Sequence, residues 1–138
     1  MLRYCTVILA AVVLSAPAFA ESPTLARIAE TGSIRIGYVP DAPPLSFDDE
    51  DGNVAGYSID LCRHIASAIR FDLGLEKIDV EFKPLVSMEQ RIDAVANGEV
   101  DIECGATTVT LSRRERVDFT LMTFITGSAI LSRKEKAI

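Results

Sequence analysis

The chain has 138 residues, a formal net charge of −6 and 49% hydrophobic residues. This acidic balance argues against nucleic acid as a partner, because phosphate binding requires clustered basic side chains. The single histidine and the three cysteines lack the spacing of a metal site, so we expect neither a metal nor a cofactor.

Residues 1–20 have the pattern of a cleavable secretory signal peptide. Arg3 provides a short positive start, an apolar stretch too brief to span a bilayer follows, and Ala18-Phe19-Ala20 is a small-x-small cleavage site. We therefore predict cleavage after Ala20. Residues 21–138 then suffice for one domain with a hydrophobic core.

Two cysteines, Cys62 and Cys104, lie after the predicted cleavage site. An exported protein meets conditions that permit disulfides, so we predict a bond between them. It would close a loop of about 40 residues and add on the order of 3 to 4 kcal/mol in the chain-entropy model. The alternative is a pair of free, buried thiols.

The first predicted elements are a helix, a strand and a long loop. The helix covers 25–30, with Thr24 as its N-cap and Gly32 at its end. A strand over 33–39 follows. The Pro-, Asp- and Gly-containing loop over 40–56 is expected to turn near its Asp-Gly pair.

An amphipathic helix is predicted over 57–70, packed on a sheet. Its apolar stripe consists of Cys62, Ile65, Ala66 and Ile69.

A second strand-helix-strand unit completes the predicted fold. The strand over 78–85 alternates apolar and polar residues, and Ser87 with Gln90 forms a capping box for a helix over 88–96. A third strand covers 100–104. The alternation of strands and helices implies parallel pairing with right-handed crossovers, so the predicted fold class is α/β.

The segment 105–108 follows the third strand at the edge of the sheet where α/β proteins bind ligands. Gly105 and Ala106 allow a close approach to the backbone, and the hydroxyls of Thr107 and Thr108 can donate or accept hydrogen bonds.

A short helix after this segment carries Arg113 in its first turn. We expect Thr110 or Ser112 to cap this helix, with Ser112 and Glu115 as a second capping box. A guanidinium beside free N–H groups is suited to a carboxylate, which it can hold with two parallel hydrogen bonds. We therefore predict that Arg113 binds a small acid.

The alternative for Arg113, Arg114 and Arg116 is a solvated face that pairs with Glu115 and Asp118. We expect this alternative for Arg114 and Arg116. Arg113 differs because its spacing from the strand-end loop lets it fold back over that loop.

Arg91 and Phe47 are further candidates for the site. Arg91 lies in the first turn of the helix at the same sheet edge, although a surface arginine would have the same pattern. Phe47, in the long loop, could provide an aromatic wall, or it could pack into its own core.

Several segments, in constant order and spacing, resemble one known family. They are "LARIAETGSIRIGY", "APPLSF", "GYSIDLCRHIASAI", "NGEVDIECGATTVTLSRRERVDFT" and "GSAIL". Over about residues 25–134 the chain resembles the periplasmic solute-binding proteins of polar amino acid ABC transporters, family 3. The "GYS" and "ECGATT" segments are most similar to the glutamate/aspartate-binding branch.

The resemblance implies a periplasmic binding protein type II-like lobe, with a mostly parallel sheet and flanking helices. It also implies a monomer in the periplasm that binds a small polar or acidic amino acid and delivers it to an ABC transporter permease. By residue, it implies that Arg113 grips the ligand α-carboxylate with help from the N–H and hydroxyl of Thr108. The Ala106 carbonyl would accept from the α-ammonium group, and Arg91 would bind a side-chain carboxylate.

The chain departs from the family pattern at three positions. Val39 stands where the acidic-amino-acid binders have a further arginine, Leu45 where phenylalanine is usual, and Ser58 where an acidic residue is common. In the family, the chain enters a second lobe after the segment equivalent to 128–138. We therefore expect 21–138 to be a first-lobe portion, truncated before the second lobe, with reduced or no activity of its own.

Two other classes of protein use this type of fold. A dehydratase-like enzyme would need catalytic residues, but in the predicted helix Cys62 points away from Asp60 and His64, so we expect no catalytic residue. A ligand-sensing module would need a transmembrane segment after the lobe.

Overall fold

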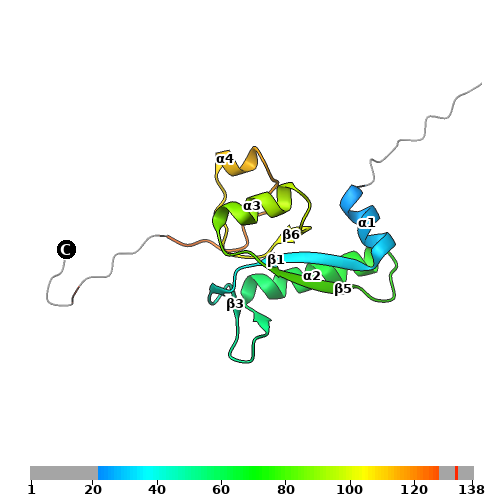
Figure 1. The fold of residues 1–138 in the computed structure, drawn as a ribbon, viewed down its shortest axis with the longest axis horizontal. Helices are drawn as coiled ribbons and strands as arrows, with labels where there is room; N and C mark the ends of the chain where they lie inside the picture. Colours follow the sequence, from blue (N-terminus) through cyan, green and yellow to red (C-terminus); the bar gives the residue numbers. More distant parts are fainter. Residues whose placement is uncertain (1–21, 128–132, 134–138) are drawn as a thin grey trace, which may run out of the picture.

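The computed structural model describes residues 22–127 and Arg133, and the predicted signal peptide therefore lies outside the described residues. Figure 1 shows the path of the chain through the described elements. These are α1 (Pro23–Thr31), β1 (Ser33–Tyr38), β2 (Asp41–Ala42), β3 (Ser46–Asp48), β4 (Val54–Ala55), α2 (Tyr57–Asp72), β5 (Asp79–Pro84), α3 (Met88–Ala96), β6 (Ile102–Glu103) and α4 (Leu111–Arg114).

The main sheet has the strand order β5-β1-β6, with both pairs parallel (Figure 1). β1 pairs with β5 from Ser33↔Asp79 to Tyr38↔Pro84 and with β6 at Ile36↔Ile102. The α/β class and the parallel pairing predicted from the sequence are confirmed. β6 is shorter than the predicted strand over 100–104.

Two apolar clusters lie on opposite faces of this sheet. Alternate residues of β1 point toward α1 and α2, because successive strand side chains alternate between faces. This larger cluster contains Ile28, Ile34, Ile36, Tyr38, Ile59, Cys62, Ala66 and Cys104. The smaller cluster, beneath α3, contains Leu85, Ala94 and Val100. Gly37 allows this packing, since a Cβ there would lie 2.4 Å from Leu85 Cδ1.

The helix boundaries show which local predictions were right. α1 begins at Pro23 with Ser22 as N-cap, so the prediction of Thr24 as the cap was wrong. Proline suits the first helical position because its missing N–H would have no partner there. Gly32 ends α1 in the left-handed conformation, φ 67°, as predicted. The Ser87–Gln90 capping box of α3 is also confirmed.

The apolar stripe predicted for α2 was partly wrong. Ile65 is 36% exposed, whereas Ile59, Cys62 and Ala66 are the buried residues of the helix. Their spacing of three and four residues forms one face toward the sheet.

The predicted loop over 40–56 contains a small antiparallel sheet of order β2-β3-β4. The Asp49 carboxylate closes the turn between β3 and β4, accepting from the backbone N–H groups of Asp51 (3.0 Å) and Asn53 (2.7 Å). These backbone hydrogen bonds, that of Asn53 foremost, lower the pKa of Asp49. Gly52 completes the turn with a φ of 81°.

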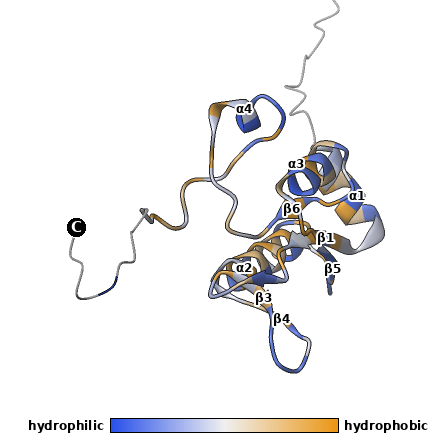
Figure 2. Cartoon of the chain, turned by 60° about the vertical axis from the view of Figure 1, so that its left-hand side comes forward, coloured by the Kyte–Doolittle hydropathy of each residue, from blue (hydrophilic) through white to orange (hydrophobic). Residues whose placement is uncertain are grey.

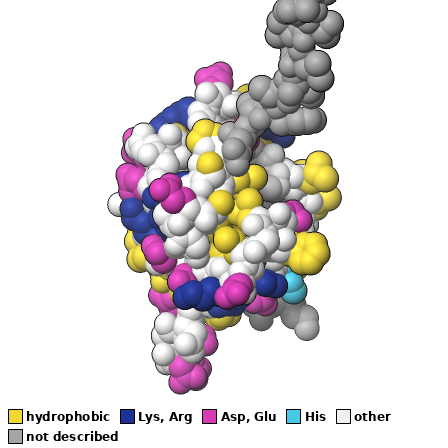
Figure 3. Space-filling model, turned by 90° about the vertical axis from the view of Figure 1, so that its right-hand side faces the viewer, with side chains coloured by type: hydrophobic (Ala, Val, Ile, Leu, Met, Phe, Trp, Pro, Cys, Tyr) yellow, Lys and Arg dark blue, Asp and Glu magenta, His cyan; other side chains and the backbone are white. Residues whose placement is uncertain are grey.

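The surface has both charged and apolar regions. Figure 3 shows one face on which hydrophobic side chains gather between scattered acidic and basic ones. Figure 2 shows hydrophobic residues along the extended segment after α4, where Leu121, Met122 and Ile125 are strongly exposed. In the part of the chain that the structure describes, no helix is long and apolar enough to cross a membrane.

Candidate ligand-binding site

A hollow of about 480 Å³ lies at the carboxyl end of β6. Its walls come from the segment 103–109, from α2 and α3, and from the extended segment 117–126. This is the edge at which parallel α/β sheets bind small ligands, because the loops and helix N-termini there present unpaired N–H groups.

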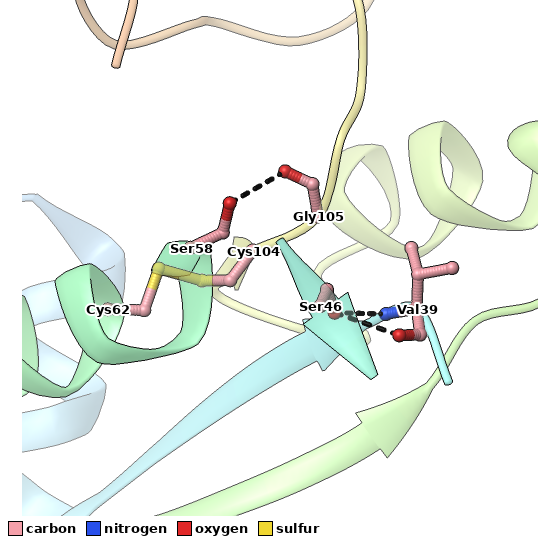
Figure 4. Close-up of a disulfide and its surroundings, with 6 residues drawn as sticks. All are labelled: Val39, Ser46, Ser58, Cys62, Cys104 and Gly105. Atoms are coloured by element: carbon pink, nitrogen blue, oxygen red, sulfur yellow. Dashed lines mark hydrogen bonds between the residues drawn. A yellow bond between two sulfur atoms is a disulfide. The ribbon is translucent and has the colours of Figure 1, made fainter. Parts of the chain in front are cut away.

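Two bonds attach the loop 105–108 to α2. The disulfide between Cys62 and Cys104 is present, as predicted. One helical turn earlier, the Ser58 hydroxyl donates to the Gly105 carbonyl oxygen at 3.1 Å. Figure 4 shows Ser58 and Cys62 projecting from α2 toward Gly105 and Cys104. The helix therefore determines where the loop begins.

The end of β1 forms a second support for the loop. The buried Ser46 hydroxyl donates to the Val39 carbonyl and accepts from the Val39 N–H, both at 2.9 Å (Figure 4). A Cβ on Gly105 would lie 2.7 Å from Val39 Cγ2 and 2.4 Å from Glu103 Oε1. Only glycine at this position leaves space for both neighbours.

Arg113 folds back over the loop. α4 is capped by Thr110, whose hydroxyl accepts from the Arg113 N–H at 3.3 Å, and Arg113 Nη1 donates to the Thr108 carbonyl at 2.6 Å. Arg113 is not among the residues that line the 480 Å³ hollow; it lines a neighbouring hollow of about 370 Å³ between α3 and α4. The predicted Ser112–Glu115 capping box is wrong, because Glu115 ends this short helix and Ser112 lies 3.2 Å from the Thr110 hydroxyl.

The other sequence-predicted residues divide into two groups. Ala106, Thr108 and Arg91 line the 480 Å³ hollow. Arg91 donates to the Val86 carbonyl at 3.1 Å and so also holds the chain after β5. Phe47 is half-buried in β3, paired with Asp41 and Ala55, and is not among the residues that line the hollow.

The prediction for the neighbouring arginines holds in part, because both are exposed but Arg116 has a different partner. Arg116 pairs with Asp93 of α3 and not with Glu115 or Asp118, because α4 lies beside α3 in the fold. Arg114 is exposed, as a solvated face requires.

The residue that sequence reasoning missed is Glu103, on β6. Its Oε1 is buried and, among the described residues, has no hydrogen-bond partner; the Thr107 hydroxyl is in the same state. Burial raises the pKa of Glu103, although Thr107, Arg91 and the Gly105 N–H lie near enough to oppose the shift. The sequence did carry a signal for Glu103, namely an acidic residue between the apolar Ile102 and Cys104.

The described residues offer no group of three or more His, Cys, Asp or Glu side chains that could hold a metal ion. The charged residues in the wall of the hollow are Arg91, Asp101, Glu103 and Asp118, and Arg113 lines the neighbouring hollow.

A parallel α/β sheet with a hollow at its strand ends is the arrangement in which many α/β proteins bind small molecules. The family model for bacterial extracellular solute-binding proteins, family 3, matches residues 34–138. The chain therefore belongs to this family, as its sequence segments predicted.

Two curated relatives show the range of the family. An L-glutamate/L-aspartate-binding protein of Pseudomonas aeruginosa is 41% identical over 127 residues, covering 90% of this chain and 42% of that protein. A glutamine-binding protein of Geobacillus stearothermophilus is 32% identical, covering 86% of this chain and 44% of that protein. The chain thus spans less than half the length of these relatives.

Solved structures agree with the fold. An ancestral cationic amino acid solute-binding protein has a TM-score of 0.60 and 35% identity, covering 70% of this chain and 39% of that one. A mutant of domain 1 from TmArgBP, in its arginine-bound form, has a TM-score of 0.55 and 26% identity, covering 66% and 64%. An ancestral cyclohexadienyl dehydratase has a TM-score of 0.58 and 30% identity, covering 69% and 36%.

Proposed function

We propose that this chain binds a small polar or acidic amino acid in the periplasm, for delivery to an ABC transporter permease. The observation that carries the proposal is the placement of Arg113 against the Thr108 carbonyl, at the end of a loop that α2 and β1 hold in place. This puts a guanidinium beside the backbone and hydroxyl groups of the loop.

In the proposed complex, Arg113 grips the α-carboxylate of the ligand with two parallel hydrogen bonds, assisted by the N–H and hydroxyl of Thr108. The Ala106 carbonyl accepts from the α-ammonium group. Each hydrogen bond to a charged group contributes about 1.5 to 3 kcal/mol.

The side chain of the ligand extends toward Arg91 in the wall of the hollow. The relatives and solved structures carry names that refer to glutamate, aspartate, glutamine and cationic amino acids, which supports the polar class of ligand. Phe47 was our candidate for an aromatic wall, and its place in β3 gives that role no support from the lining of the hollow.

The described lobe holds one wall of the proposed site. If a complete protein bound at about 1 μM and each lobe contributed half of the free energy, one lobe would bind near 1 mM. The arginine-bound form of domain 1 from TmArgBP supports binding by a single domain.

We also propose that the chain is not an enzyme, although one similar structure is that of an ancestral dehydratase. Cys62 is bonded to Cys104 and therefore provides no thiolate nucleophile, and His64 is exposed on α2 away from the hollow. Dehydration of a cyclohexadienyl acid, followed by ultraviolet absorbance, would contradict this proposal.

The test is calorimetric titration of the purified chain with glutamate, aspartate, glutamine, arginine and a dicarboxylate without an amino group. We expect an amino acid to bind in the millimolar range or tighter, and Arg113→Ala to weaken it at least about tenfold, a loss of about 1.4 kcal/mol. Arg114→Ala, one residue along the same helix, is the matched control. Equal binding by Arg113→Ala, folded by circular dichroism, would refute the role of Arg113.

A further inference from the structure

Glu103 lies on the α3 side of the main sheet. Its neighbours Ile102 and Cys104 pack with the larger cluster on the α2 side, and strand side chains alternate between faces. Glu103 is therefore directed toward the face that carries α3 and Arg91. It lies opposite Gly37 of β1, whose missing side chain leaves that face open to Leu85 and Val100.

The Glu103 carboxylate lies directly against the first residue of the loop. The 2.4 Å between Glu103 Oε1 and the position of a Cβ on Gly105 leaves no space for even a methyl group between them. Ser58 holds the other side of Gly105 through its hydrogen bond to the carbonyl oxygen. Gly105 is thus held between a hydroxyl of α2 and a carboxylate of β6.

Arg91 is the cation nearest in effect to Glu103, although its own hydrogen bonds go to the carbonyls of Leu85 and Val86. Asp101, two residues earlier, pairs with Arg27 and Arg35. Near the loop, the residue after β1 is the apolar Val39, and α2 presents the neutral Ser58. Arg91 of α3 is the charged group that favours the ionised form of Glu103.

Keeping Glu103 ionised in this place lowers the stability of the folded protein. Its buried Oε1 and the buried Thr107 hydroxyl have no hydrogen-bond partner in the described part of the chain, and burial disfavours the charged carboxylate. A glutamine would fill the same volume without the charge. A buried charge that weakens the fold is typical of a functional position.

We propose that Glu103 is a positioning residue of the ligand site, whose ionised carboxylate supports the loop 105–108 from beneath. This inference rests on the proposed function for its effect on affinity, but its effect on the loop is independent of any ligand. Protonation of Glu103 then loosens the loop.

The direction of the stability change separates this role from a purely structural one. Because the pKa of folded Glu103 is raised, the folded state binds more protons than the unfolded state just above the ordinary glutamate pKa. Stability therefore falls as pH rises through that window. Glu103→Gln should melt at the same temperature as the wild type or higher at pH 7, while its loop becomes less ordered.

The first experiment follows the backbone N–H signals of Gly105 and Thr107 by NMR from pH 4 to pH 8, without ligand. In the wild type we expect both signals to titrate with an apparent pKa above that of ordinary glutamate. In Glu103→Gln the titration should be absent, with faster hydrogen exchange in 105–108. The matched control is Glu99→Gln, an exposed carboxylate paired with Lys83. Signals that titrate equally in Glu103→Gln, or do not titrate in the wild type, would overturn the proposal.

The second experiment measures affinity for the amino acid that the wild type binds best. Glu103→Gln should bind it about tenfold more weakly at pH 7, and the two proteins should converge as pH falls and Glu103 becomes protonated. Unchanged or tighter binding by Glu103→Gln would overturn the positioning role. If the wild type binds none of the amino acids, the proposed function fails, and the NMR titration still decides the effect of Glu103 on the loop.

Discussion

Ser58 and Gly105 are joined by a hydrogen bond from a helix hydroxyl to the first carbonyl of the loop, 3.1 Å long. Cys62, four residues after Ser58, is bonded to Cys104, the residue before Gly105. Residues four apart lie on one helix face, so α2 holds consecutive loop residues by one covalent and one hydrogen bond. The position of the loop depends on both.

Replacing both Cys62 and Cys104 by serine should lower the free energy of unfolding by about 3 to 4 kcal/mol, since the disulfide restricts the unfolded chain. Urea denaturation of the wild type and the double variant measures this loss. A reducing agent should bring the wild type to the same midpoint. Equal midpoints without reductant would show that the bond contributes nothing.

Ser58→Ala should lower the free energy of unfolding by about 1 kcal/mol, because the Gly105 carbonyl loses its hydrogen-bond donor. Hydrogen exchange at the amides of 105–108 should become faster. The control is Ser67→Ala, whose hydroxyl bonds within α2 to the Arg63 carbonyl. That variant should leave the loop unchanged. Equal exchange rates in the two variants would contradict the role of Ser58.

Gly105→Ala should destabilise the protein by about 1 to 3 kcal/mol, because its methyl group would overlap Glu103 Oε1 and Val39 Cγ2. Thermal unfolding measures the cost. Gly127→Ala, where a Cβ would meet nothing within 4 Å, serves as the control and should change stability by less than about 0.5 kcal/mol. A tolerated alanine at 105 would mean that Glu103 and Val39 both move aside freely.

Asp101→Asn should lower the free energy of unfolding by about 3 kcal/mol, because this nearly buried carboxylate pairs with both Arg27 and Arg35. The distance from Arg35 Nη2 to Asp101 Oδ1 is 2.8 Å. Asp60→Asn breaks the exposed pair with Arg63 and should cost less than about 1 kcal/mol. Urea midpoints that shift equally in the two variants would exclude a special role for Asp101.

Asp49→Ala should remove the hydrogen bonds that close the β3–β4 turn. Because the pKa of folded Asp49 is lowered, its stabilising effect is present above the unfolded aspartate pKa and is lost as pH falls through the folded value. The wild type should therefore melt above the variant at pH 7 and approach it in acid. Melting curves recorded at pH 7 and in acid measure this. The same difference in melting temperature between wild type and variant under both conditions would contradict the prediction.

Much of the fold follows from short stretches of sequence. The Ser87–Gln90 capping box, the end of α1 at Gly32 and the parallel pairing of the main strands were all predicted correctly. Each depends on residues a few positions apart, or on the alternation of strand and helix along the chain. Thr24 was misplaced as a cap because Pro23 starts the helix two residues earlier than the hydroxyl of Thr24 suggested.

Other features depend on residues far apart in the chain. Asp101 meets Arg27 and Arg35, and Arg116 meets Asp93, only after the strands and helices have packed. No local pattern specifies these partners, since the same charges could equally be solvated.

The sequence by itself determined the order of the main helices and strands, the family and the candidate Arg113, because periodicity, caps and motif spacing can be seen along the chain. Only the tertiary structure revealed that the Glu103 Oε1 is buried against Gly105, and that Phe47 lies in a separate strand. The reason is physical: the burial and the electrostatic environment of a side chain are set by its neighbours in space, and strand pairing and helix packing bring those neighbours together.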